Sequence, residues 1–239
     1  MKIEILFEDS DLVVVNKPPG VLTIPDRFDS SKPNLSGLLR KKRETVLTVH
    51  RLDKETSGVI VFAKNESAHK NLSIQFENRT VDKTYHVLLE GLMQPTEGKI
   101  DQPIAPHPAQ AGKMMVSNKG KKSKTTYMVL EQFQRYCLVA AKIHTGRTHQ
   151  IRVHFESIGY PLAVDKLYGA REKFMLSEIK LKKYRLGKNH EERPLISRSS
   201  LHAFHLGFIH PDTKKRLDFE AAYPKDFRAV LQQLRKWNK

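Results

Sequence analysis

The sequence predicts an α+β fold in which helices flank a mixed, largely antiparallel β-sheet. Short apolar runs rich in β-branched residues recur at hairpin spacing, with Gly and Pro between them. A few other stretches show the three- and four-residue spacing of amphipathic helices. The chain has 239 residues, of which 39% are hydrophobic, so it can bury a substantial core. We expect a single domain over residues 1–239.

The N-terminal part is predicted to begin with a hairpin, whose second strand ends sharply at Lys17-Pro18-Pro19-Gly20. A helix is expected to start after Asn65, which suits a helix cap. Ala68, Leu72 and Phe76 share one face of that helix, and this face should pack on the sheet. The strands expected here are residues 3–7, 12–15 and 59–63. The expected helices are a short basic one over 35–43 and an amphipathic one over 66–78.

The middle of the chain is predicted to be mostly strands followed by one helix. The expected strands are residues 83–90, 98–104, 113–117, 123–133 and 136–143. The helix is expected over 148–157, with Thr148 as its N-cap and Gly159 as its terminator. Ile151 and Phe155 lie on its apolar face, while His149 and Arg152 share another.

The last part holds a charge-dense, mostly basic segment over residues 171–198, which we interpret as an insertion. Contact with nucleic acid and a plain solvated surface are equally good interpretations of it. Pro224 and Asp226 then suit the first turn of a final helix. The apolar stripe of that helix consists of Phe227, Val230, Leu231 and Leu234.

The charge of the chain indicates a polyanionic partner. Its 42 Lys and Arg exceed its 26 Asp and Glu, giving a formal net charge of +16 and a pI near 9.8. RNA, DNA and an anionic membrane all fit this surplus. The sequence contains no apolar run of the roughly 20 residues that span a bilayer, and no signal or transit peptide is recognisable. The single Cys137 excludes an internal disulfide, and we expect a cytoplasmic protein.

The string from His50 to Gly58 is the most informative of the chain. It holds the carboxylate of Asp53 between Arg51 and Lys54, just before a buried strand. A polar loop at the edge of a rigid element is a common place for a functional acid, and neighbouring arginines keep such an acid ionised. A local salt bridge is the alternative interpretation.

Two further features are compatible with a catalytic site. In the string Thr145 to Arg152, a Gly-containing turn leads into a helix and directs Arg147 and Arg152 to its N-terminus, where a phosphate or a carboxylate is favoured. Surface arginines on an amphipathic helix are the alternative. Tyr85 points to the same side of its predicted strand as Val87; most strand tyrosines belong to a core.

Other chemistries find little support in the residue spacings. His149 and His154 are five residues apart and so do not share a helical face for a metal, and one cysteine excludes a thiolate cage. The sequence lacks a complete phosphate loop, a Gly-x-Ser-x-Gly elbow and a strand-linked Gly-x-Gly-x-x-Gly. We therefore expect no metal and no dinucleotide.

In order along the chain, four strings resemble the RluA-type pseudouridine synthases: residues 16–20, 50–58, 83–85 and 145–154. Asp165-Lys166-Leu167-Tyr168-Gly169, Leu201-His202-Ala203 and His210-Pro211 are also similar to strings of that family. The resemblance covers most of the chain. Ile24 and Val164 depart from it, where many relatives have His and Gly.

The resemblance implies the pseudouridine synthase fold with a central basic cleft. It also implies an isomerase that converts uridine in RNA to pseudouridine without a cofactor. Asp53 would be the essential carboxylate, attacking either the ribose or the base, Tyr85 would lie against the target base, and Arg152 would pair with Asp53. Arg51 would fill the stack that the flipped uridine leaves.

Further RNA contacts are expected from His50, Arg147 and Lys17, with His50 mainly bracing its loop. The expected substrate is structured RNA, either large-subunit rRNA or tRNA, bound by a monomer with no membrane association. We expect no separate N-terminal RNA-binding module, which weakens a ribosomal target. The competing hypotheses are a non-catalytic RNA-binding or ribosome-assembly protein, and a nuclease or phosphodiesterase.

Overall fold

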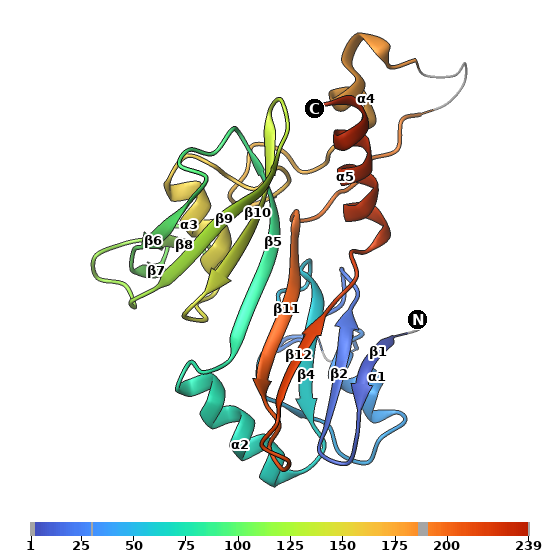
Figure 1. Ribbon diagram of the computed structural model, residues 1–239, viewed down its shortest axis with the longest axis vertical. Helices are drawn as coiled ribbons and strands as arrows, with labels where there is room; N and C mark the ends of the chain where they lie inside the picture. The colour runs from blue at the N-terminus through green and yellow to red at the C-terminus, as the bar shows by residue number, and fades with distance from the viewer. Residues whose placement is uncertain (1–2, 30, 186–190, 239) are drawn as a thin grey trace. The chain divides into compact units, whose positions relative to one another are not determined.

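The computed structural model describes residues 3–29, 31–185 and 191–238. Contacts within the chain divide it into two compact units, each built from two segments. Unit 1 comprises Met1–Tyr85 and His202–Tyr223, and unit 2 comprises His86–Leu201 and Pro224–Lys239. The prediction of a single domain stays a prediction. The mixed, mostly antiparallel sheet that the sequence predicts is confirmed (Figure 1).

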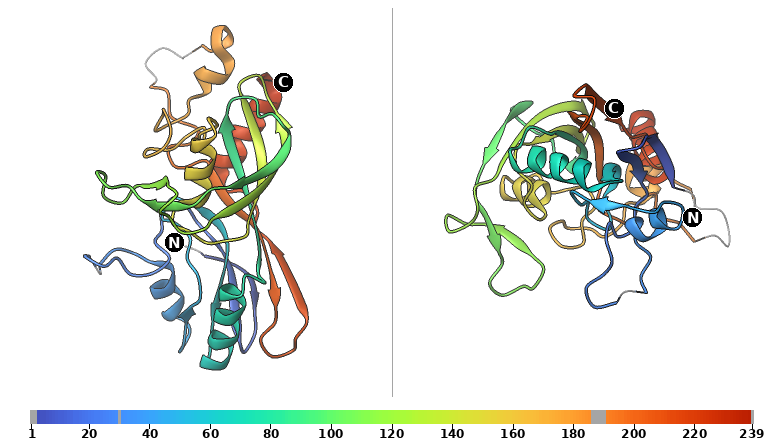
Figure 2. Two further views of the ribbon diagram at one scale, coloured as in Figure 1. Left: turned by 90° about the vertical axis from the view of Figure 1, so that its left-hand side faces the viewer. Right: turned by 90° about the horizontal axis from the view of Figure 1, so that it is seen from below.

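Unit 1 contains strands in the order β1-β2-β4-β11-β5, with β3 paired to β4 and β12 paired to β11. Its strands are β1 (Glu4–Glu8), β2 (Leu12–Lys17), β3 (Leu47–Thr48), β4 (Ser57–Ala63), β5 (Asp82–Glu90), which continues into unit 2, β11 (Leu201–Ile209) and β12 (Arg216–Glu220). Its helices are α1 (Leu35–Arg40) and α2 (Glu66–Glu77). The β4–β11 pair is parallel, whereas the β1–β2, β2–β4 and β11–β12 pairs are antiparallel, and Figure 2 shows β11 and β12 as a hairpin.

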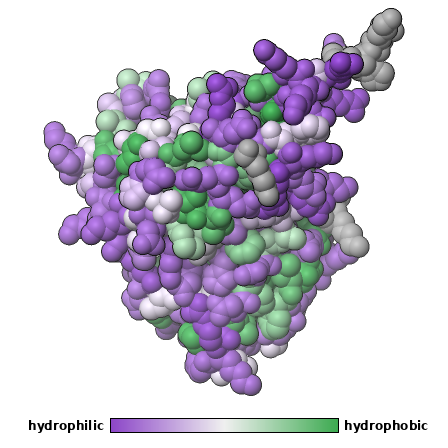
Figure 3. Space-filling view, turned by 45° about the horizontal axis from the view of Figure 1, so that its top comes forward, coloured by the Kyte–Doolittle hydropathy of each residue, from purple (hydrophilic) through white to green (hydrophobic). Residues whose placement is uncertain are grey.

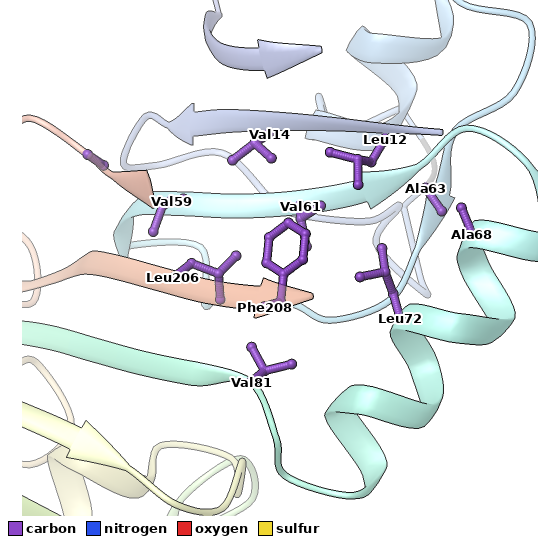
Figure 4. Packing of buried hydrophobic residues seen from close by; sticks show 11 residues of the cluster. Leu12, Val14, Val59, Val61, Ala63, Ala68, Leu72, Val81, Leu206 and Phe208 are labelled. Atoms are coloured by element: carbon purple, nitrogen blue, oxygen red, sulfur yellow. The ribbon is translucent and has the colours of Figure 1, made fainter. Parts of the chain in front are cut away.

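The central strands of unit 1 are apolar on both faces, because both faces are covered. Alternate residues of β2 and β4 belong to two different clusters of buried side chains, as the two-residue period of a strand requires. One cluster, shown in Figure 4, joins β2, β4 and β11 to Ala68 and Leu72 of α2. The other joins the opposite face to Leu35 and Leu39 of α1 and to Leu52. The strand predicted over 59–63 is therefore confirmed as a buried strand.

Unit 2 contains the strand order β5-β10-β9-β6 and a separate two-stranded sheet, β7-β8. Its strands are β6 (Glu97–Asp101), β7 (Ile104–Pro106), β8 (Met114–Val116), β9 (Lys124–Gln132) and β10 (Tyr136–Ile143). Its helical elements are α3 (Gln150–Ser157), α4 (Leu176–Lys180), the 3-10 turn η1 (Leu181–Lys183) and α5 (Lys225–Trp237). The four apolar residues predicted for the last helix are all buried in α5.

Helix α2 forms as predicted. The side chain of Asn65 accepts a hydrogen bond from the backbone N–H of Ala68 at 2.8 Å, so Asn65 caps the helix. The helix buries Ala68 and Leu72 and ends at Glu77. Helix α1 is shorter than predicted and ends at Arg40, because the following basic residues turn away and Arg43 pairs with Glu8.

Two predictions in the middle of the chain are wrong. Residues 98–104 form parts of two strands, because Pro103 has no N–H to donate and interrupts the run before β7. Thr148 is not the cap of α3. The helix begins at Gln150, and its N-cap is His149, which has a left-handed backbone conformation with φ of 55° and makes no side-chain cap bond. The C-terminal prediction is confirmed, because Gly159 follows α3 with φ of 83°.

The segment over 171–198 contains α4 and η1, and residues 186–190 of it lie outside the described residues. A short bridge between Phe174 and Ile196 brings its two ends together. Lys180, Lys183 and Lys236 of α4, η1 and α5 place their ammonium groups over the ring of Trp237, at 4.9, 5.8 and 5.3 Å from its centre. No helix among the described residues is long and apolar enough to cross a membrane. Hydrophilic side chains cover most of the face seen in Figure 3.

Candidate active site

The loop that carries Asp53 is fixed by its neighbour Leu52. The Leu52 side chain is buried in the cluster below α1. Its backbone N–H donates to the hydroxyl of Thr23 at 3.1 Å, and the same hydroxyl donates to the Leu52 carbonyl at 2.8 Å. After Asp53 the loop turns, with the Thr56 N–H donating to the Asp53 carbonyl at 3.1 Å. Asp53 is half-buried and Arg51 is exposed, so the loop presents polar groups from a rigid base.

Lys17 lies in a different environment from the surface position that an RNA contact would need. Its side chain is fully buried. The ammonium group donates to the backbone carbonyls of Pro18, Val21 and Lys54, at 3.1, 2.6 and 3.0 Å. These bonds latch the turn after β2 onto the Asp53 loop. The structure therefore corrects our expectation for Lys17, because an ammonium inside this turn holds the loop and offers no surface to a phosphate.

His50 joins the same loop to β4. Its Nε2 accepts a hydrogen bond from the backbone N–H of Val61 on β4 at 3.2 Å, and its ring stacks on Phe76 with the centroids 4.4 Å apart. Burial, with a smaller effect from the charge of Lys83, lowers the pKa of His50 to about 3. His50 is therefore neutral at physiological pH, as an acceptor at Nε2 requires.

Gly58 allows β4 to begin immediately after the Asp53 loop. Its φ is 119°, and a Cβ at this position would lie 2.1 Å from the carbonyl oxygen of Ala203. Ala203 is the partner of Gly58 in the parallel β4–β11 ladder. Only glycine permits this approach of the two strands.

Tyr85 ends the unit 1 part of β5 and lies near Asp53. Its ring packs against the buried cluster that contains Leu52. Burial raises the pKa of the Tyr85 hydroxyl, and the negative charge of Asp53 raises it further. Tyr85 is therefore a neutral phenol at any physiological pH, and it lies within electrostatic reach of the carboxylate.

The string Thr145 to Arg152 is held by a buried amide. The side-chain oxygen of Gln150 accepts from the Thr145 hydroxyl at 2.6 Å and from the Arg147 N–H at 3.1 Å. Its side-chain nitrogen donates to the carbonyl of Lys124 and to the hydroxyl of Thr125, both at 3.0 Å. Gln150 thus shapes the turn before α3, the role that we had expected of Thr148. The sequence did not reveal this role of Gln150, because no local pattern distinguishes a glutamine that caps a helix from a glutamine on the surface.

Arg152 is buried on α3 and held by Asp165. Its Nε and Nη2 donate to the two carboxylate oxygens of Asp165 at 2.6 and 2.8 Å, and its guanidinium lies 4.8 Å from the centre of the Tyr168 ring. Asp165 is fully buried and also accepts from the backbone N–H groups of Leu167 and Tyr168, at 2.9 and 3.1 Å. These contacts hold the guanidinium of Arg152, which is always charged, in a single orientation.

The Tyr168 hydroxyl connects this site to the β7–β8 hairpin. It accepts a hydrogen bond from the backbone N–H of Met114 at 2.7 Å and lies 2.9 Å from Nδ1 of His149. In the sequence, Asp165 and Tyr168 stand out only because their string resembles one of the RluA-type synthases. Their roles were missed because a pairing across a loop has no periodic signal.

The predicted residues fall into both units. Asp53, Tyr85, Arg51, His50 and Lys17 belong to unit 1. Arg152 and Arg147 belong to unit 2. The pairing of Arg152 with Asp53 and the central basic cleft stay predictions.

Asp9, Asp11 and His210 bring their possible ligand atoms within 4.8 Å of one another. His210 donates from Nε2 to Asp9 at 2.8 Å, because its Nδ1 accepts from two backbone amides of the turn that follows it. We interpret this cluster as a clamp between two hairpin turns of unit 1, because hydrogen bonds occupy the atoms that a metal would need.

Comparisons with known proteins agree with this picture. Residues 11–157 match the sequence pattern of the family described as RNA pseudouridylate synthase. An uncharacterized RNA pseudouridine synthase of Aquifex aeolicus is 40% identical over 97% of this chain and 73% of its own length. Ribosomal large subunit pseudouridine synthase D of Pseudomonas aeruginosa is 37% identical over 98% of this chain and 72% of its own. Among solved structures, human RNA pseudouridylate synthase domain containing 4 has a TM-score of 0.74 at 28% identity, covering 97% of this chain and 93% of its own.

Proposed function

Because the chain belongs to the RNA pseudouridylate synthase family, we propose that it isomerises a uridine of structured RNA to pseudouridine and that Asp53 carries the reaction. Pseudouridine synthases are isomerases, so this protein is an isomerase. The observation that carries the proposal for Asp53 is its place on a rigid loop beside a neutral Tyr85. A non-catalytic RNA-binding protein is the less favoured alternative.

The proposed chemistry needs an ionised carboxylate at the target nucleotide. The bond between N1 of uracil and the ribose breaks, and the base rejoins the ribose through C5. A carboxylate assists this rearrangement by attacking the ribose or the base, in the manner of the nucleophilic acids of glycosidases. No cofactor is part of the proposal.

Tyr85 and Arg51 are proposed to handle the base before and after cleavage. A uridine inside a helix or loop has to be flipped out, at a cost of a few kcal/mol. The neutral ring of Tyr85 would lie against the flipped uracil and keep it in place while it is detached. The exposed, planar guanidinium of Arg51 suits the gap that the uridine leaves, because such a group stacks on bases.

Arg152 is proposed to orient Asp53. Its own orientation is fixed within unit 2 by Asp165 and Tyr168. Because an arginine stays charged throughout the physiological range, its guanidinium can hold a neighbouring carboxylate through charge-assisted hydrogen bonds.

The proposed substrate is large-subunit ribosomal RNA, with tRNA as the second candidate. Relatives 34–37% identical to this chain are named ribosomal large subunit pseudouridine synthase D. The formal charge of +16 suits a partner made of phosphates, and binding should weaken steeply as salt is added. We propose that the protein acts as a monomer in the cytoplasm.

The test is the release of tritium from RNA labelled at C5 of uridine. The wild-type protein should release tritium and leave the RNA at full length on a denaturing gel, whereas a nuclease would shorten it. Asp53→Asn should abolish release while RNA binding stays within a few-fold. Glu55→Gln, a carboxylate change two residues away in the same loop, is the matched control and should retain most of the activity. Full activity of Asp53→Asn would refute the assignment. Saturable binding by the wild type without new pseudouridine would refute the isomerase.

Mapping of pseudouridines separates the candidate substrates. Ribosomal RNA and tRNA from cells with and without the protein should differ at a position in large-subunit rRNA. If pseudouridine were lost only from tRNA, tRNA would be the substrate and the proposal of large-subunit rRNA would be wrong.

A further inference from the structure

Unit 2 contains a pocket of about 380 Å³, and Arg147 is the one lining residue for which the sequence predicts an RNA contact. It lies between the β7–β8 hairpin, the turn over 117–121 and the loop before α3. Its lining residues are Ile104, Ala105, Pro106, Met114, Lys119, Gly120, Lys121, Gly146, Arg147 and Thr148. Asp53, Tyr85 and Arg152 are not among them.

The wall formed by Gly120 and Lys121 is fixed to β7. Ile104 and Lys121 exchange two backbone hydrogen bonds, at 3.0 and 2.9 Å. Gly120 packs so closely on this pair that a Cβ would lie 2.5 Å from the carbonyl carbon of Ile104. The Gly120 N–H donates to the Ser117 carbonyl at 2.8 Å and closes the turn. Hydrogen bonds therefore fix the backbone conformation from which Lys119 and Lys121 extend.

The opposite wall is fixed as well. The Arg147 backbone N–H donates to the buried side chain of Gln150 at 3.1 Å, and its Nε donates to the carbonyl of Lys122 at 3.2 Å. Met114 is held by the hydroxyl of Tyr168 through its own N–H at 2.7 Å. The pocket is thus formed before any ligand enters it, which lowers the entropic cost of binding.

The lining combines two chemistries. Lys119, Lys121 and Arg147 supply three positive charges, and the lining includes no acidic residue. Ile104, Ala105, Pro106 and Met114 supply the larger apolar side chains of the lining. Cations attract a phosphate, while an apolar surface accepts the face of a base. The volume lies at the small end of ligand sites, so it fits one nucleotide and excludes a duplex.

We propose that this pocket binds a single unstacked nucleotide of the substrate RNA other than the target uridine. Its base lies on the side of Pro106 and Met114, and its phosphate contacts Lys119, Lys121 and Arg147. The proposal rests on the proposed function, since it concerns the RNA that the enzyme modifies. Such a subsite selects RNA whose loop displays a second splayed nucleotide, which is recognition by shape.

The direct test is binding of uridine 5′-monophosphate to the full-length Asp53→Asn protein carrying ¹³C-labelled Met and Ile methyl groups. Titration should shift the NMR methyl signals of Met114 and Ile104 in a saturable way. Uridine alone and inorganic phosphate should each shift them far less. In the Lys119→Gln/Lys121→Gln double variant the Kd should rise at least about tenfold, because two charge-assisted phosphate contacts are lost. Lys122→Gln/Lys166→Gln is the matched control, since it removes two exposed charges of unit 2 outside the pocket and should leave the Kd within about twofold.

Two outcomes would overturn the proposal at this stage. Equal shifts with inorganic phosphate would reveal a simple anion site, and the absence of shifts at Met114 and Ile104 would show that the pocket takes no nucleotide.

A kinetic test keeps the subsite separate from the proposed function. With C5-labelled RNA and otherwise wild-type protein, Lys119→Gln/Lys121→Gln should raise KM at least about fivefold and leave kcat within about twofold, because the contact is made equally in the ground and transition states. An unchanged KM would overturn the subsite. Absence of tritium release in the wild type would overturn the function alone, and the nucleotide titration would still decide the pocket.

Discussion

The guanidinium of Arg152 and the carboxylate of Asp165 form a buried, two-bonded ion pair, with Nε and Nη2 at 2.6 and 2.8 Å from the two oxygens. The Asp165 side chain is 0% exposed and that of Arg152 is 10% exposed. Such a buried ion pair fixes the orientation of the Arg152 side chain. The Tyr168 ring, which packs against the guanidinium, restricts its rotation.

Asp165→Asn should destabilise the protein by about 3 kcal/mol, because it leaves a buried guanidinium without this counter-charge. Urea denaturation followed by circular dichroism measures the change. The double variant Asp165→Asn/Arg152→Met should recover part of the loss, since it also removes the buried charge. Asp101→Asn, an exposed aspartate of the same unit, is the control and should have almost no effect. Strictly additive losses in the double variant would contradict a direct coupling of the pair.

Arg152→Met should lower kcat for tritium release at least about a hundredfold and change the Kd for RNA by less than about fivefold. The physical reason is that a side chain only 10% exposed offers little surface to phosphates, whereas it can orient a carboxylate. Arg147→Met provides the matched comparison, because Arg147 lines the basic pocket and should mainly weaken binding. Similar losses of binding and catalysis in Arg152→Met would instead identify Arg152 as a phosphate contact.

Local pattern accounts for the parts of the fold that the sequence predicts well. The buried strand β4, the hairpin β1–β2 and the helix capped by Asn65 each depend on residues within one turn or one strand of each other. The placement of Asp53 before β4 follows from the same local signal. A two-residue or four-residue period is visible in a single sequence, and it does not depend on contacts with residues far away in the chain.

The misplaced features depend on contacts with distant residues. Lys17 is a buried latch because the Lys54 carbonyl, 37 residues away, lies within 3.0 Å of its ammonium. The start of α3 is set by Gln150, whose partners at Lys124 and Thr125 are on another strand. Asp165 reaches Arg152 through the loop after α3. None of these pairings leaves a periodic trace, so residue type alone predicted an RNA contact for Lys17 and a threonine cap for α3.

Tyr168→Phe should loosen the β7–β8 hairpin and leave Arg152 in place. The phenyl ring keeps its contact with the guanidinium, but the acceptor for the Met114 N–H is lost. Hydrogen exchange of the Met114 amide should accelerate about tenfold, equivalent to about 1.4 kcal/mol of lost local protection. Tyr184→Phe serves as the control, because Tyr184 is a tyrosine of the same unit in a different segment. Unchanged exchange at Met114 would contradict the role of the Tyr168 hydroxyl as an anchor.

The half-buried His50 should make the protein less stable as the pH falls below 7. Its pKa is about 3 in the folded protein, against an ordinary value of 6.5 that the unfolded chain should show. Between these values the unfolded chain binds one more proton at this site, so the free energy of unfolding falls by up to about 1.4 kcal/mol per pH unit as acid is added. Stability is fully present above pH 6.5 and is lost toward pH 3. His86, whose pKa burial lowers to about 4, adds a similar dependence over a narrower range.

His50→Gln isolates this contribution, because the Gln oxygen can still accept the Val61 N–H but does not titrate. Urea unfolding at pH 7 and at pH 5 should show the wild type losing about 2 kcal/mol more than the variant between the two values, as one proton taken up only by the unfolded state predicts. His86→Gln is the parallel variant and should remove its own share of the acid sensitivity. If the wild type and His50→Gln lost the same stability over this interval, His50 would have to be accessible to protons in the folded state. Its role would then be that of a contact beside Asp53, and the loop would be held chiefly by Thr23 and Lys17, which join it to the turn after β2.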